Sequence, residues 1–202
     1  MKKFVAALAV VPLVFSLAAC GSSSNGNGDS KKITIGVVGN ETANQVLKDE
    51  AAKQGITIEY SEFTDYAQPN PAVDAGDNDM NRFQHIAYLA NYNVSSGKDL
   101  QIVGSTNIYP MAIFSKKHKK VDEIPQGGTI AIPNDSVNEA RALLLLKAQN
   151  LVTLKSDVHS PTHDDIDTEK SKVKVTPVDA SQTVVSLDSV DASVINNTFL
   201  AD

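Results

Sequence analysis

The chain has 202 residues, a formal net charge of −6 at pH 7, one cysteine and no tryptophan. The single cysteine excludes an intrachain disulfide and a cysteine-rich metal site. The acidic balance gives no electrostatic footprint for nucleic acid or for an anionic lipid surface, so we expect no nucleic-acid partner.

Residues 1–20 predict a lipoprotein signal peptide. Lys2 and Lys3 precede an apolar stretch at 4–15 that is too short to be a permanent transmembrane helix. The sequence Leu-Ala-Ala-Cys that ends at Cys20 resembles a bacterial lipobox, in which the cysteine becomes the lipidated first residue of the mature protein. We therefore expect a lipid on Cys20 to anchor the protein on the extracytoplasmic face of the cell membrane. The alternative is a plain secretory signal that happens to end in cysteine.

Residues 21–32 have no apolar side chain and predict a flexible tether. Strands and helices then alternate. The expected strands cover 33–38, 56–60, 79–83, 100–105, 129–132, 172–176 and 193–195, and the expected helices cover 43–54, 70–76, 85–92 and 136–149. This alternation predicts an α/β fold with mainly parallel sheets flanked by helices. An extended crossing near Tyr109-Pro110 divides the pattern, which predicts two lobes at residues 33–112 and 113–202.

The stretch from Thr129 to Leu146 predicts a buried strand, a polar turn and a helix that starts with a capping box of Ser136 and Glu139. The free N–H groups and the positive dipole end of such a helix suit an anion. Arg141 lies one turn into the helix and shares a face with Asn138, where its guanidinium would grip a carboxylate with two hydrogen bonds. The alternative is an ordinary strand-to-helix corner with a surface arginine.

Ligands of open parallel α/β sheets bind beyond the carboxyl ends of the strands. Polar and aromatic residues gather at those ends in this sequence. They include Asn40, Tyr66, Phe83, His85, Asn107, Tyr109, Asn134, Arg141 and Asn196. This convergence favours a binding site over a plain structural domain.

Several short motifs, in this order and spacing, resemble the MetQ/NlpA family of methionine-binding lipoproteins of bacterial ABC importers. The motifs are the lipobox, Phe63-Thr64-Asp65-Tyr66, Phe83-Gln84-His85, Tyr109-Pro110, Pro133-Asn134-Asp135 with Asn138 and Arg141, and Val194-Ile195-Asn196-Asn197. Each motif alone is weak, but their order over residues 33–199 is specific. The chain departs from the family pattern at Ile86-Ala87, Ser136 and Ala140.

The resemblance implies a type II periplasmic-binding-protein fold whose two lobes close on one amino acid. It implies that Arg141 holds the ligand carboxylate, that Asn134 and Asn196 bind the amino-acid head, and that Tyr66, Phe83, His85 and Tyr109 line the thioether pocket. The implied function is capture of methionine, first of all L-methionine, with D-methionine or a methionine dipeptide as alternatives. The ligand would pass to the permease subunits of an ABC transporter, with no cofactor, no metal and no catalysis.

Family members continue beyond the position of Asp202, so we expect this chain to be truncated at its C-terminus, with the first lobe incomplete and one sheet edge unpaired. Two rival functions stay open. One is a surface lipoprotein with an adhesive or host-contact role and a vestigial pocket, and the other is an enzyme on the same scaffold that depends on His85.

Two further motifs each allow a functional interpretation and a structural one. His159 and His163 suggest a metal site, but Pro161 between them prevents a shared regular helix and favours a solvated loop. The basic run at residues 116–120 suggests a nucleic-acid or membrane patch, but the acidic remainder favours an exposed loop.

Overall fold

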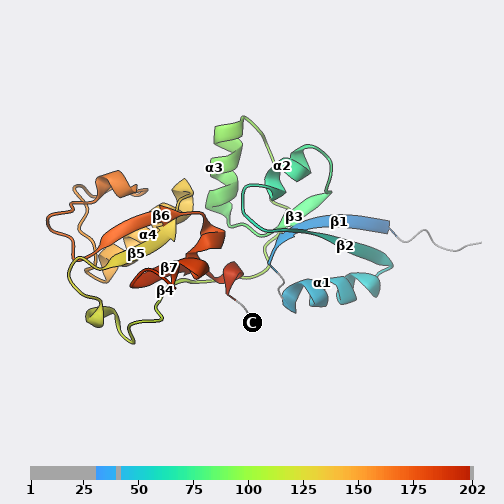
Figure 1. Ribbon diagram of the computed structural model, residues 1–202. Helices are drawn as coiled ribbons and strands as arrows, with labels where there is room; N and C mark the ends of the chain where they lie inside the picture. Colours follow the sequence, from blue (N-terminus) through green and yellow to red (C-terminus); the bar gives the residue numbers. More distant parts are fainter. Residues whose placement is uncertain (1–30, 40–41, 201–202) are drawn as a thin grey trace, which may run out of the picture.

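The computed structural model describes residues 31–39 and 42–200, and it contains two sheets that lie in two neighbouring α/β lobes (Figure 1). We call the elements from β1 to α3 the first lobe and those from β4 to β7 the second lobe. The predicted signal peptide, Cys20 and most of the predicted tether lie outside the described residues. Within the described ranges, no helix has the length and apolar character needed to cross a bilayer.

The first lobe is a parallel three-stranded sheet in the order β2-β1-β3. Its elements are β1 (Lys31–Val38), α1 (Thr42–Ala52), β2 (Ile56–Phe63), α2 (Pro69–Asp74), β3 (Met80–Arg82) and α3 (Ile86–Ser96). The last four residues of β1 are all buried, because the central strand of a parallel sheet is covered on both faces. Ile35 and Val37 of this strand pack with Ala51 of α1 and Ile58 of β2 to form the core.

The second lobe is a four-stranded sheet in the order β4-β7-β5-β6. Its elements are β4 (Met111–Phe114), β5 (Thr129–Pro133), α4 (Ser136–Ala148), β6 (Lys174–Val178), α5 (Thr183–Ser186) and β7 (Ala192–Asn196). β5 is parallel to β6 and β7, and β4 is antiparallel to β7. Leu143 and Leu146 of α4 are fully buried against Ile130, Ile132 and Val194 of the sheet. This packing fixes the α4 helix, and with it Arg141, against the end of the sheet.

The chain passes between the lobes at two places. Residues 98–110 lead from α3 to β4. A short 3-10 helix at Asn197–Phe199 follows β7, and Phe199 returns to the first lobe, where it packs against Val38 and Tyr66. The ends of β7 and β1 therefore lie close together at the junction of the lobes.

The predicted α/β class with mainly parallel sheets is confirmed, but some elements differ from the prediction. The strand predicted at 100–105 is wrong, because residues 98–110 contain no helix or strand. Leu100 is held by Asn93 of α3, whose side-chain oxygen accepts from the Leu100 N–H (3.1 Å) and whose side-chain nitrogen donates to the Leu100 carbonyl oxygen (2.9 Å). Ile102 and Val103 remain exposed, and among the described residues no strand pairs with them. An apolar run alone does not supply the neighbour that a strand needs.

Several boundaries also differ, and the contacts explain three of them. β1 begins at Lys31, within the predicted tether, because its first residues pair with β2. The α4 cap is Asp135 rather than Ser136, since the Asp135 carboxylate accepts from the Asn138 N–H at 2.9 Å. The predicted capping box is therefore wrong, and Glu139 instead accepts from the backbone N–H (2.8 Å) and the ring Nδ1 (2.6 Å) of His163. The α2 helix begins at Pro69, so Asn70 is inside the helix and not its cap.

Candidate ligand-binding site

The candidate site is built around the first turn of α4, where β5 delivers the chain to the junction of the lobes. The Asp135 carboxylate caps the helix and also accepts from the Asn138 side-chain amide at 3.1 and 3.0 Å. These bonds fix the orientation of the Asn138 amide, whose residue is only 1% exposed. Its oxygen therefore faces away from Asp135 and towards the other lobe.

Three N–H donors converge on the Asn138 Oδ1 atom. Arg141 Nη1 donates at 2.7 Å and Asn196 Nδ2 at 3.1 Å. The ring Nε2 of His85, from the first lobe, lies 3.3 Å from the same oxygen. The structure thus brings together three of the residues that the sequence predicts for the site. They come from the cap of α3, from α4 and from the end of β7.

His85 is held in one tautomer by its own helix. It is the cap of α3, and its Nδ1 accepts from the Tyr88 N–H at 3.2 Å, so the proton lies on Nε2, which donates to Asn138. Burial lowers the pKa of His85 below 6.5, the nearby Arg141 charge lowers it further, and Asn138 and Asp135 act in the opposite direction. The imidazole is therefore a neutral hydrogen-bond donor at neutral pH.

Acid should weaken the fold through His85. Because folding lowers the His85 pKa, His85 stabilises the folded state above pH 6.5. This stabilisation is lost as the pH falls through the pKa that His85 has in the folded state. We expect urea unfolding to show a stability that falls between pH 7 and pH 5, and this slope should be smaller in His85→Gln. The matched control is His159→Gln, at an exposed histidine. An equal slope in His85→Gln and in the unmodified protein would contradict the assignment.

An aromatic cluster lies beside the polar donors. The Tyr66 ring centroid is 5.7 Å from Phe83, 6.0 Å from Tyr88 and 4.9 Å from Phe199. Tyr88 also packs edge-on against His85 at 6.2 Å and donates its hydroxyl to the Tyr66 carbonyl oxygen at 3.1 Å. Burial raises the pKa of the Tyr88 hydroxyl to about 12, so this donor is protonated at neutral pH. The cluster gives the junction of the lobes an apolar wall.

Asn196 carries an unpaired acceptor. Its side chain is buried at the end of β7, and its Oδ1 has no hydrogen-bond partner among the residues that the structure describes. A buried amide oxygen without a donor costs about 1–3 kcal/mol of stability, so such atoms are rare in native proteins and each one calls for an explanation. The atom belongs to the same side chain whose Nδ2 contacts Asn138. A fixed acceptor therefore lies beside the three converging donors.

The other two predicted site residues are more exposed. Asn134 lies on the turn between β5 and α4 and is exposed. Tyr109 lies in the irregular crossing before β4 and is 39% exposed. Sequence reasoning did not assign Asn138 and Phe199 to the site. Asn138 shares a helix face with Arg141, which was the available signal, whereas Phe199 carries no signal beyond its place after β7.

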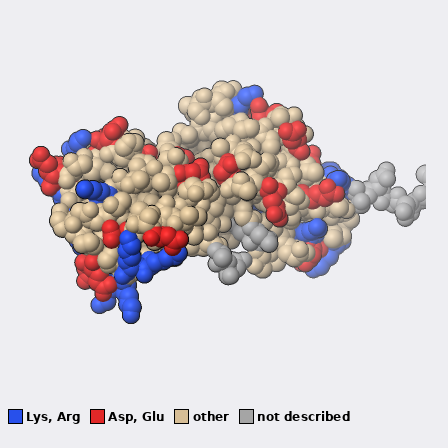
Figure 2. Space-filling view, viewed as in Figure 1, with Lys and Arg blue, Asp and Glu red and all other residues tan. Residues whose placement is uncertain are grey.

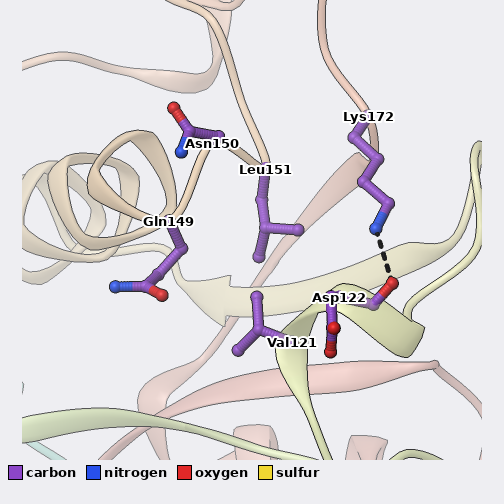
Figure 3. A pocket seen from close by; sticks show the side chains of 6 residues that line it. All are labelled: Val121, Asp122, Gln149, Asn150, Leu151 and Lys172. Carbon is purple, nitrogen blue, oxygen red and sulfur yellow. Dashed lines mark hydrogen bonds between the residues drawn. The ribbon is translucent and has the colours of Figure 1, made fainter.

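The cavities recorded in the structure lie away from this cluster. One of about 420 Å³ lies in the second lobe between Val121, Asp122, Gln149, Asn150, Leu151 and Lys172, where Lys172 Nζ donates to the Asp122 carbonyl oxygen at 3.1 Å (Figure 3). Another of about 270 Å³ lies against α3 and residues 99–102. Neither is lined by a predicted site residue. The hydrogen bonds, and not cavity size, identify the candidate site.

Two other motifs have structural partners. His163 binds Glu139, and in the described part of the chain no three histidine, cysteine, aspartate or glutamate side chains are grouped to hold a metal ion. The basic run at 116–120 is mostly exposed, and Lys116 pairs with Asp188 while Lys117 Nζ donates to the Ser189 carbonyl oxygen at 3.0 Å. Figure 2 shows basic side chains projecting from the second lobe with acidic ones beside them. The run therefore does not form a purely positive surface.

Two α/β lobes with polar donors and an aromatic wall at their junction define a substrate-binding protein. The family model described as NlpA lipoprotein matches residues 33–202. The chain belongs to this family. Relatives whose names state a role are described as binding proteins.

Individual relatives agree in sequence and in fold. The chain is 39% identical to the probable D-methionine-binding lipoprotein MetQ of Vibrio cholerae over 98% of this chain and 74% of the relative. It is 42% identical, with a TM-score of 0.77, to the substrate-binding protein of a methionine transporter from Streptococcus pneumoniae, over 83% of this chain and 69% of that one. It is 38% identical, with a TM-score of 0.78, to a nutrient-binding protein from Burkholderia cenocepacia bound to methionine, over 83% of this chain and 72% of that one. The chain spans as little as 57% of the length of the curated relatives that it matches.

Proposed function

We propose that this chain is an extracytoplasmic solute-binding lipoprotein that captures methionine and delivers it to the permease of an ABC transporter. The observation that carries the proposal is the convergence of Arg141, His85 and Asn196 on the Asn138 oxygen. Guanidinium, imidazole and amide donors suit a carboxylate, because charged hydrogen bonds are about twice as strong as neutral ones. Two relatives support the same ligand, since one is named as a probable D-methionine-binding lipoprotein and the other is a nutrient-binding protein bound to methionine.

The amino-acid head is matched by the remaining polar atoms. The unpaired Asn196 Oδ1 would accept from the ligand ammonium. A buried zwitterion needs a partner for both of its charges, and this site offers donors and an acceptor on neighbouring atoms. Asn134, on the turn before α4, would contact the head from the solvent side. The combination favours a working pocket over the vestigial pocket of the adhesive alternative.

The methionine side chain would pack against Tyr66, Phe83, His85 and Tyr109. Sulfur contacts with aromatic rings contribute about 0.3–1.5 kcal/mol each. Since His85 comes from the first lobe and Arg141 from the second, ligand contacts on both sides would close the lobes by a hinge motion. The crossing at 98–110 is the proposed hinge. A lipid on Cys20 would keep the closed protein near its permease at the membrane.

Isothermal titration calorimetry tests the ligand. We expect one L-methionine to bind per chain, more tightly than norleucine, which has a methylene in place of the sulfur. D-methionine and glycyl-methionine are the competing ligands, and a tighter signal from either would reassign the ligand within the same site. Absence of binding for all of these compounds to folded protein would overturn the proposal.

A further inference from the structure

Two side-chain amides of the first lobe, one buried and one partly buried, bond to each other. Asn70 of α2, which is 1% exposed, donates its Nδ2 to Gln84 Oε1 at 2.9 Å. Gln84 Nε2 donates back to Asn70 Oδ1 at 2.6 Å. Asn81 of β3 also donates to Asn70 Oδ1, at 2.8 Å, and accepts from Gln84 at 3.1 Å. Every amide of this group is therefore bonded to another member.

Gln84 is the middle residue of a short linker. Phe83 and His85, on either side of it, both face the candidate site, and residues 83–85 belong to no helix or strand. β3 ends at Arg82 and α3 begins at Ile86, so sheet hydrogen bonds do not hold this linker. The two reciprocal bonds from Gln84 to Asn70 join it to α2. Fully bonded buried networks of this kind restrict a segment to one conformation.

We propose that Asn70 and Gln84 are positioning residues, which hold the 83–85 linker so that the Phe83 ring and the His85 imidazole face the ligand. This inference rests on the proposed function, because the two positioned side chains are proposed ligand contacts. The side-chain bonds of both amides join them to each other and to Asn81. Their effect is to remove the freedom that the linker would otherwise lose on binding.

The same lobe contains a matched control. Asn78 is 4% exposed and its Oδ1 accepts from Ser61 at 2.7 Å, which is a buried amide bond of similar kind. Its recorded bond joins the loop before β3 to β2 and does not involve the 83–85 linker. A general loss of stability should therefore appear in both Asn70→Ala and Asn78→Ala. An effect on the linker should appear only in the first.

The first measurement is methionine affinity by calorimetry. Leaving a buried amide unpaired is expected to weaken binding about tenfold in Asn70→Ala. Gln84→Ala should show the same loss, and it provides a second test if Asn70→Ala does not fold. Asn78→Ala should bind within about twofold of the unmodified protein. In the exchanged variant Asn70→Gln/Gln84→Asn both amides remain, and most of the affinity should return.

The second measurement does not need a ligand. NMR titration of the His85 ring reports on its surroundings, which are Tyr88 of α3 and the Asn138, Asp135 and Arg141 side chains of α4. A released linker exposes the ring, so the His85 pKa should rise towards 6.5 in Asn70→Ala and Gln84→Ala but not in Asn78→Ala. If Asn70→Ala and Gln84→Ala match the control in both measurements, the inference is overturned. If the unmodified protein binds no methionine, the proposed function fails, and the ring titration still decides the positioning role.

Discussion

Replacing Arg141 by alanine is expected to cause the largest loss of methionine binding of any single substitution in this chain. Arg141 is the one guanidinium in the donor cluster, and its Nη1 lies 2.7 Å from the oxygen on which the cluster converges. Truncating one partner of a buried charged pair costs about 2–5 kcal/mol. This loss corresponds to a rise in Kd of roughly 30-fold to 3,000-fold. Calorimetry with L-methionine measures it directly.

Two companion variants define the cause. Arg141→Lys keeps the charge but not the planar fork, so it should recover only part of the affinity. Lys147→Ala removes a cation from the exposed end of the same helix, where Lys147 pairs with Asp157, and it should leave the affinity unchanged. If Arg141→Ala binds methionine as well as Lys147→Ala does, the carboxylate site lies elsewhere.

Replacing Asn196 by alanine should separate binding from stability. Its Oδ1 is buried and unpaired, so the folded protein loses no bond when that atom is removed. The Nδ2 bond to Asn138 is lost, but Asn138 Oδ1 keeps Arg141 and His85 as donors. We expect the free energy of unfolding to change by less than about 1.5 kcal/mol, the upper value for one net hydrogen bond. The ligand ammonium loses its acceptor, so Kd should rise roughly 10-fold to 100-fold, as expected for a hydrogen bond to a charged group.

Urea unfolding measures the free energy of unfolding, and calorimetry on the same preparation measures the Kd for methionine. Asn197→Ala is the control, since Asn197 is the next residue and is only half-buried. Strong destabilisation by Asn196→Ala, with methionine affinity retained in the folded fraction, would assign Asn196 a structural role instead.

The order of the elements could be predicted from sequence because each has a local signal. The alternation of apolar strands with capped helices is enough for the parallel α/β class, and the polar residues after strands point to one end of the sheets. The segment 100–105 shows the limit of such signals, because a strand is defined by its neighbour and the described residues supply none. The exact helix start at Asp135 was missed for a similar reason, since the competing Glu139 is held by His163 from a distant loop.

The residues of the site were easier to predict than their contacts. Arg141, His85 and Asn196 belong to recognisable motifs, but the sequence does not show that they meet at the Asn138 oxygen, although Asn138 shares a helix face with Arg141. The predicted helix starts at Asn70, whereas the structure places Asn70 within α2 and bonded to Gln84. Contacts between side chains on separate elements depend on how the elements pack, and sequence periodicity does not report this.

The Asn138 cluster also has a consequence for the order of folding. Its bonds join residues 53 and 58 positions apart in the chain, to His85 and Asn196 respectively. The His85 bond crosses between the lobes, and Asn196 is the last residue of β7, so these donors can meet only where the elements of both sheets are in place. We therefore expect the donor cluster to assemble after the lobes have formed their cores, as the last step of folding. A ligand that binds the cluster would slow unfolding and leave the early folding rate unchanged, because its site does not yet exist in the transition state.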